Sequence, residues 1–206
     1  RDGAEASRQA ERLIALSAEY SLQYWTVFWR LSQAIARVSP DAGDDDIDAA
    51  LAEAVESITT MRTAYGSQLQ CTRYLGWTIA AALECGRLPL ARALLEDALA
   101  LTAEERHYVA DLQRLRAAVR QAEGADASEV EGLLRDAVAL ARAQGAHLLA
   151  LRACTDLARL LQAQGRDDVA PQVLAAACDA VQGGAATPDV RDAHALLASL
   201  RPGPAA

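Results

Sequence analysis

A stretch of eight residues occurs twice in the chain. Residues 94–101 read LLEDALAL and residues 133–140 read LLRDAVAL, so six of the eight positions are identical at an offset of 39. Weaker copies lie at residues 173–177 and 50–55. A period of roughly 40 residues is typical of helical repeats, in which each unit stacks on its neighbours to bury its apolar face. The repeat therefore restricts the chain to a small group of architectures.

The composition indicates that helices make up each repeat. The 206 residues include 48 Ala and 29 Leu but only 5 Ile and 11 Val. Ala and Leu favour helices, whereas β-branched residues favour strands. Apolar residues make up 52% of the chain and charged residues 23%, which is typical of a well-packed globular protein and not of a disordered chain. We predict an all-α fold.

Glycines and capping patterns predict where the helices begin and end. Gly followed by Arg occurs at Gly86 and again 79 residues later at Gly165, and Gly is favoured directly after a helix because it adopts a left-handed conformation without steric cost. Residues 102–105 and 128–131 match capping boxes at helix starts. The predicted helices span residues 4–19, 22–38, 46–65, 68–85, 89–102, 104–123, 128–144, 146–164, 167–182 and 188–200. Their connections are mostly short, so neighbouring helices are expected to pack antiparallel.

The period and the Gly-Arg markers between helices resemble tetratricopeptide repeats (TPR) of the longer kind. We therefore expect a right-handed solenoid of TPR-like antiparallel helix hairpins, with about ten helices. The segments 39–43 and 182–186 interrupt the pattern, but we interpret neither as a domain boundary. We expect one domain over residues 1–206, with a frayed tail at residues 201–206.

A more specific resemblance involves the segments 15–20 (ALSAEY), 151–160 (LRACTDLARL), 164–166 (QGR) and 187–190 (TPDV). The chain is similar to the C-terminal helical-repeat region of large bacterial regulators that carry an AAA/STAND ATPase module, often together with an adenylate or guanylate cyclase domain. The resemblance covers nearly the whole chain and implies a regulatory, sensing or docking role. Because the chain does not begin with Met, we expect it to be the C-terminal part of a larger protein. Neither the ATPase nor the cyclase signature occurs in it, so their chemistry is not assigned to these residues.

Charge and cysteine usage predict the compartment and exclude some partners. The net charge is −8, and all 20 basic residues are Arg, spread along the chain without a dense cluster. Nucleic acids and anionic membranes require a basic face, so we expect neither as a partner. No apolar run approaches the length of a membrane span. The four cysteines form no CxxC pair and lie in apolar stretches, which predicts buried thiols in the cytoplasm. A redox-sensing thiol is the alternative.

We predict no catalytic residue, no cofactor and no metal site. The chain contains no Lys and none of the HExxH, GxSxG and GxGxxG motifs. Asp44, Asp46 and Asp48 lack the glycine and the glutamate spacing of a calcium loop, so we expect them to stabilise a helix start. A small-molecule enzyme is therefore the weakest of three functional hypotheses.

Residues 20–29 hold five of the nine aromatic residues, and two readings of this segment stay open. In the first, Tyr24, Trp25 and Trp29 form an interface for a partner, because large aromatic side chains dominate binding hot spots. In the second, the aromatic side chains belong to the core and pack against the first helix and the helix at 46–65.

A second candidate site is the inner surface of the array, which the first helix of each pair lines in proteins of this type. Arginines and aromatic residues on these helices are candidates to bind a carboxylate, a phosphate or an acidic peptide. The candidate residues are Arg73, Tyr74, Trp77, Arg114, Arg152 and Arg159. The alternative is that the arginines form ion pairs with Asp and Glu on neighbouring helices.

The leading functional hypothesis is a non-catalytic, regulatory TPR-like domain that binds a protein, a peptide or a small effector. Upstream domains of the same polypeptide are among the expected partners. The alternative is a self-association scaffold that oligomerises the parent protein through its aromatic N-terminal end.

Overall fold

A computed structural model describes residues 3–66, 70–103, 105–184 and 187–200. Within these residues it contains ten α-helices and one short 3₁₀ helix, so the all-α prediction is confirmed. The helices are α1 (Gly3–Glu19), α2 (Gln23–Arg37), α3 (Asp44–Thr63), α4 (Cys71–Glu84), α5 (Leu88–Ala100), η1 (Leu101–Ala103), α6 (Val109–Ala122), α7 (Ala127–Ala143), α8 (His147–Ala163), α9 (Ala170–Ala180) and α10 (Pro188–Leu200). The predicted frayed tail at 201–206 lies outside the described residues.

Helix boundaries agree with the sequence prediction to within a few residues, with one exception. The helix expected at 104–123 begins only at Val109, and residues 101–103 form the 3₁₀ helix η1. The capping box expected at residues 102–105 is therefore wrong. Thr102 Oγ1 donates to the carbonyl oxygen of Leu99, and the buried carboxylate of Glu105 accepts the backbone N–H of Thr72 at the start of α4. Glu105 thus caps a different helix from the one the motif indicated.

The second expected capping box, at residues 128–131, is also wrong. Helix α7 begins at Ala127, so Ser128 lies inside its first turn, and no side chain caps this end. Glu131 instead pairs with Arg135 one turn further on, at 2.7 Å, and with Arg166 at the same distance. The helix predicted at 46–65 begins two residues earlier, at Asp44, so the aspartates 44–46 lie in the first turn of α3 and not before it; there they favour the helix dipole.

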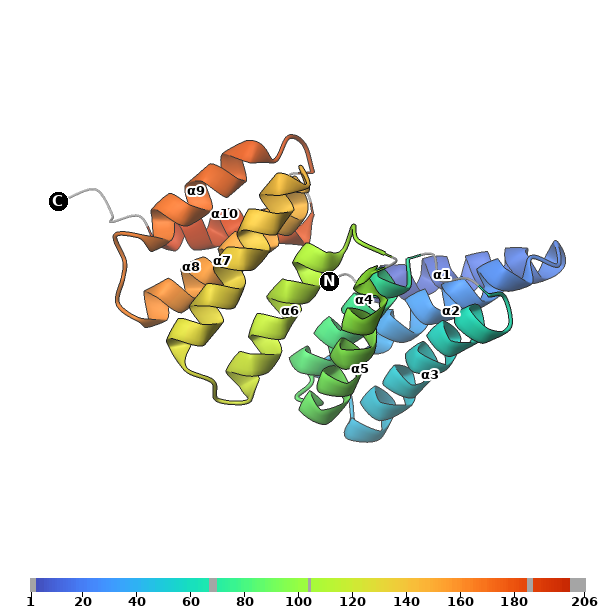
Figure 1. Ribbon diagram of the computed structural model, residues 1–206. Helices are drawn as coiled ribbons and strands as arrows, with labels where there is room; N and C mark the ends of the chain where they lie inside the picture. Colours follow the sequence, from blue (N-terminus) through green and yellow to red (C-terminus); the bar gives the residue numbers. More distant parts are fainter. Residues whose placement is uncertain (1–2, 67–69, 104, 185–186, 201–206) are drawn as a thin grey trace. The chain divides into compact units, whose positions relative to one another are not determined.

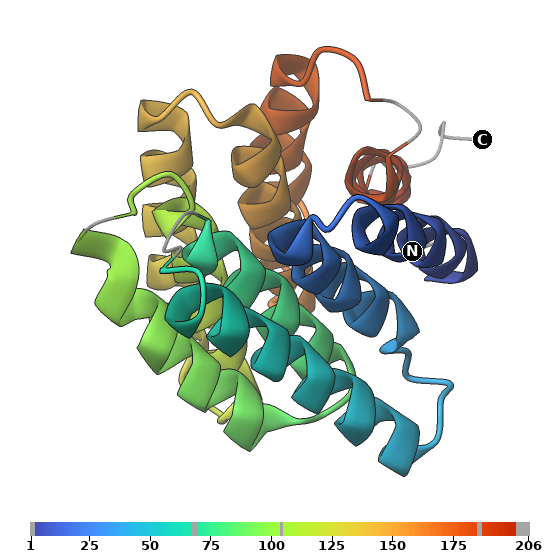
Figure 2. The ribbon, with the colours of Figure 1, turned by 90° about the vertical axis from the view of Figure 1, so that its right-hand side faces the viewer.

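The chain divides into two compact units, residues 1–106 and 107–206, which we describe separately. In the first unit each helix packs antiparallel on the next in chain order, from α1 to α5 (Figure 1). Figure 2 shows α1, α2 and α3 side by side, in colours running from dark blue to cyan. Helix α2 also contacts α4, the next helix but one. At this contact the ring of Phe28 on α2 meets that of Tyr74 on α4.

The second unit repeats this pattern with α6 to α9, and α10 closes it. Helix α8 contacts α6 on one side and α10 on the other, while α7 and α9 pack behind it. Leu151, Leu157, Leu161 and Leu174 are among the fully buried side chains at the centre of this unit. No helix of the described ranges is both long and apolar enough to span a membrane.

The Gly-Arg pairs at residues 86–87 and 165–166 make similar contacts, one pair in each unit. Gly86 and Gly165 both have a φ of +71°, and the backbone N–H of the following arginine bonds back to the preceding helix. The side chain of Arg87 reaches Asp44 and Asp48 in the first turns of α3, and that of Arg166 reaches Glu131 in α7. At these two positions the sequence repeat therefore produces the same kind of helix end and a similar ion pair between the arginine and an earlier helix.

Candidate functional site

Aromatic rings of α2 and α4 join into one cluster in the first unit. The ring of Phe28 lies 5.6 Å from that of Tyr74, measured between centroids, and Tyr74 lies 5.7 Å from Trp77. Phe28 also meets Trp29 at 4.6 Å. Edge-to-face pairs at such separations stabilise by about 1 kcal/mol beyond the apolar area they bury. We call the following residues the aromatic cluster: Tyr24, Trp25, Phe28, Trp29, Tyr65, Tyr74 and Trp77.

The aromatic cluster is buried at one end and exposed at the other. Tyr74 is buried, whereas Trp25 is 48% exposed. The described residues contain six exposed large apolar side chains, and five of them belong to the first unit: Leu16, Tyr20, Leu22, Trp25 and Tyr65. Of these, Trp25 and Tyr65 both contact the ring of Tyr24, and exposed apolar patches mark interaction surfaces in soluble proteins. Within the segment 20–29, Tyr24, Phe28 and Trp29 are partly buried and Tyr20 and Trp25 are exposed, so both readings of this segment stay predictions.

The turn between α1 and α2 presents part of this exposed area. Ser21 has a φ of +57°, in the left-handed region that glycine normally occupies. The backbone N–H of Leu22 bonds to the carbonyl oxygen of Ser17 at 2.7 Å, which closes a tight helix end around Ser21. This geometry leaves Tyr20 and Leu22 on either side of the turn, both exposed.

Arg73 and Trp77 lie one turn apart on α4 and stack on each other. The guanidinium carbon of Arg73 lies 4.4 Å from the centroid of the Trp77 ring, a cation–π contact. Its Nη1 also donates to Oε1 of Gln70 at 2.8 Å. Burial raises the pKa of the neighbouring Tyr74 hydroxyl to about 12, with Tyr24 adding to the shift. On this part of α4, Arg73 thus holds its cation over the ring of Trp77.

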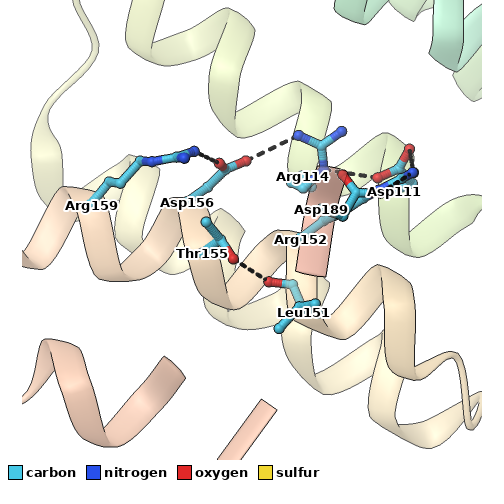
Figure 3. Close-up of polar contacts among 8 residues, drawn as sticks. All are labelled: Asp111, Arg114, Leu151, Arg152, Thr155, Asp156, Arg159 and Asp189. Atoms are coloured by element: carbon cyan, nitrogen blue, oxygen red, sulfur yellow. Dashed lines mark hydrogen bonds and ion pairs between the residues drawn. The ribbon is translucent and has the colours of Figure 1, made fainter. Parts of the chain in front are cut away.

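In the second unit, ion pairs occupy the face that α6, α8 and α10 share (Figure 3). Arg114 on α6 donates to Asp111 at 2.8 Å and to Asp156 on α8 at 3.0 Å. Arg152 on α8 donates to Asp189 on α10 at 2.7 Å. We call the following residues the ion-pair network: Asp111, Arg114, Arg152, Asp156, Arg159 and Asp189.

The charges of the ion-pair network balance, with three arginines against three aspartates. The side chains of Asp111 and Arg114 are only 8% and 15% exposed, whereas that of Arg159 is 54% exposed. Burial disfavours the charge of Arg114, but the carboxylates of Asp111 and Asp156 outweigh it, and the pKa of Arg114 is raised above its usual value. The network therefore ties three helices together with charges that are already neutralised.

The structure places the candidate residues named from the sequence in two groups. Tyr24, Trp25, Trp29, Tyr74, Trp77 and Arg73 come together in the first unit, so the predicted interface and part of the predicted inner surface are one site. Arg114, Arg152 and Arg159 come together in the second unit, where they form the ion pairs that we considered as the alternative to anion binding.

Several members of these groups were not singled out from the sequence. They are Tyr65, at the rim of the aromatic cluster, and the three aspartates of the ion-pair network. Phe28, at the centre of the cluster, belongs to the aromatic segment 20–29 described from the sequence. One signal was present: Arg73 and Arg152 are 79 residues apart, as are Trp77 and Asp156, the same offset as the Gly-Arg markers. At this offset Asp156 occupies the same position of the repeat as Trp77, so an alignment of the repeats indicates both residues as candidates.

Cysteines and metal ligands offer no second candidate site. Cys71, Cys154 and Cys178 are buried and Cys85 is partly buried. Burial raises the pKa of the Cys71 and Cys154 thiols, which disfavours the reactive thiolate. In the part of the chain that the structure describes, no three His, Cys, Asp or Glu side chains gather in a way that could hold a metal ion.

Comparisons of the chain with protein-family models, with curated proteins and with solved structures found no match. The functional argument therefore depends on the residues and contacts described above.

Proposed function

We propose that the chain is a non-catalytic binding module that recruits a protein or peptide through the aromatic cluster. The single observation that carries this proposal is the half-exposed Trp25, which continues into Trp29, Phe28 and Tyr74 without a charged residue between them. Large aromatic side chains with one buried end are rigid, and they bind partners at a low entropic cost.

The ion-pair network supports the choice of the first unit. An anionic ligand at Arg114 or Arg152 would have to displace Asp156 or Asp189 from distances of 2.7 to 3.0 Å. Displacing a carboxylate that is partly shielded from water leaves a charge without its partner, which is unfavourable. Trp25 and Tyr65, at the exposed end of the aromatic cluster, contact other aromatic rings, and an apolar partner can cover such rings without displacing a carboxylate from them.

The sequence resemblance leads us to propose, in addition, a fold for this module and a kind of parent protein. The helix pairs would be TPR-like and form a right-handed solenoid, in a regulatory or sensor region of a larger bacterial signalling ATPase or cyclase-type regulator in the cytoplasm. Its partners would be a separate protein, a small effector or the upstream domains of the same polypeptide. The sequential antiparallel pairs and the repeated Gly-Arg ends are compatible with this context.

A thermal-shift screen with the purified chain tests the proposal. The probes are nucleotides, sugars, amino acids and a random peptide library divided into pools. A ligand of the folded state raises the melting temperature, and we expect a peptide pool to do so. Trp25→Ala should abolish the shift, while Leu148→Ala, which removes another exposed apolar side chain (39% exposed, against 48% for Trp25) from α8, should leave it unchanged. If no peptide pool gave a shift that depends on Trp25, the proposal would be contradicted.

Self-association is the second candidate function, because the same exposed side chains could meet their counterparts on another copy. Light scattering over a wide range of protein concentration distinguishes the two. A mass that stays at 21.9 kDa excludes self-association. A mass that rises with concentration, and returns to that of the monomer in Trp25→Ala, replaces the partner-binding proposal with a scaffold.

A further inference from the structure

A groove between α3 and α5 forms a second apolar surface in the first unit. It has a volume of about 470 Å³ and is lined by Asp48, Leu51, Ala52, Val55, Glu56 and Leu90. The five residues from α3 follow helical spacing, so they share one face of that helix. Leu51 is 1% exposed and forms the floor, whereas Val55 and Leu90 are partly buried and Ala52 is exposed. A groove of this size fits a few apolar side chains.

Carboxylates lie at both ends of this apolar floor. At one end, Arg87 pairs with Asp44 at 2.6 Å and with Asp48 at 2.7 Å, but Asp45 and Asp46 in the same turn of α3 are exposed and have no ion-pair partner among the described residues. At the other end Glu56 is exposed, and the described part of the chain supplies no cation to it. The nearest basic residue on α5, Arg92, is paired with Glu96.

We propose that this groove docks a basic amphipathic helix of a partner protein. Apolar side chains spaced three and four residues apart would enter between α3 and α5, as in other helix-in-groove complexes. Arginine or lysine side chains flanking them would pair with Glu56 at one end and, at the other, with Asp45, which lies three residues before Asp48 on the same side of α3. Complementary charge selects the basic helix over an acidic one of the same apolar pattern. This site is separate from the aromatic cluster, so the inference does not depend on the function proposed above.

The first test is fluorescence anisotropy with two labelled helical peptides. Both have leucines at helical spacing on one face; the remaining positions hold arginine in one peptide and glutamate in the other. The whole chain should bind the arginine peptide and bind the glutamate peptide at least about tenfold more weakly. Equal affinity for both peptides, or no binding of either, would overturn the proposal.

Two matched variants of α3 locate the binding. Ala52→Arg places a long cation in the groove and should weaken binding of the arginine peptide about tenfold or more. Ala49→Arg makes the same change at an exposed position of the same helix that does not line the groove, and should change the affinity less than about twofold. Circular dichroism confirms that both variants fold. Equal losses in the two variants would mean general electrostatic attraction and would refute the groove.

A third variant separates this site from the aromatic cluster. Trp25→Ala should leave binding of the arginine peptide unchanged, while Glu56→Gln should weaken it. If Trp25→Ala abolished binding instead, the peptide would lie on the aromatic cluster and the groove proposal would be wrong.

Discussion

In the first unit α4 carries Arg73 and Trp77 one turn apart, and in the second unit α8 carries Arg152 and Asp156 at the same spacing and the same repeat offset. On α4 the arginine stacks on the tryptophan, and the rings of α2 extend the apolar area to the exposed Trp25. On α8 both residues pair with charged residues of neighbouring helices.

The comparison shows how one change of side chain decides the role of a helix face. An aspartate can neutralise arginines from two helices at once, and the face is then fully occupied by contacts within the unit. A tryptophan offers apolar area that only another apolar surface can cover. Two units with the same order of helices therefore differ in what they leave available to a partner.

The largest predicted effect concerns the buried part of the ion-pair network. Arg114→Ala removes the cation between Asp111 and Asp156 and leaves these carboxylates, one of them buried, with only their longer contacts to Arg152 at 3.9 Å and to Arg159 at 3.4 Å. We expect the free energy of unfolding to fall by about 3–5 kcal/mol, measured by urea denaturation followed by circular dichroism. The matched change Arg159→Ala removes a mostly exposed cation and should cost less than about 1 kcal/mol. Equal costs would show that the network does not stabilise the unit.

A smaller effect is expected where the network reaches α10. Asp189→Ala removes the carboxylate that holds Arg152 to α10, and both side chains are partly exposed. The expected loss is about 1 kcal/mol and should shrink at high salt, because screening weakens exposed pairs. Asp192→Ala, at an exposed position of the same helix, is the control and should have almost no effect. A loss that is independent of salt would mean that Asp189 acts through packing and not through charge.

The smallest expected effect concerns the titration of the Tyr74 hydroxyl, at the buried end of the aromatic cluster. The pKa of Tyr74 is raised to about 12 in the folded chain, above the ordinary tyrosine value of about 10. The folded state therefore favours the neutral phenol, and the stability linked to this group is fully present below pH 10 and is lost as the pH rises towards 12. Ultraviolet absorbance of the phenolate should show a component with a midpoint near pH 12 that disappears in Tyr74→Phe. If Tyr74→Phe instead reduced the component with a midpoint near pH 10, Tyr74 would be in contact with water.

Most of the fold followed from local signals in the sequence. Helix ends at Gly86 and Gly165 were predictable because the left-handed conformation there is a property of the residue itself. The start of α6 was not, because Glu105 fits a capping box in sequence but bonds to Thr72, 33 residues earlier in the chain. A contact of that range depends on how helices pack, which a local motif does not encode.

The candidate site was predictable to a similar degree. Aromatic residues at helical spacing indicated that Trp25 and Trp29 act together, but their connection to Trp77 passes through the contact between Phe28 and Tyr74, which joins two helices. The sequence did not predict which residues pair with the arginines, because those contacts also join different helices. Whether Arg114 faces a ligand or Asp156 depends on the register between α6 and α8, and that register is fixed only by packing.

The most direct test of the central claim uses intrinsic fluorescence. The only three tryptophans of the chain, Trp25, Trp29 and Trp77, all belong to the aromatic cluster. Peptides selected from a random library for binding to the whole chain are titrated while tryptophan emission is recorded. We predict a saturable change in emission, and a loss of affinity in Trp25→Ala but not in Leu148→Ala. If every selected peptide bound with unchanged emission, and equally well to Trp25→Ala, the claim that the aromatic cluster is a binding site would be contradicted.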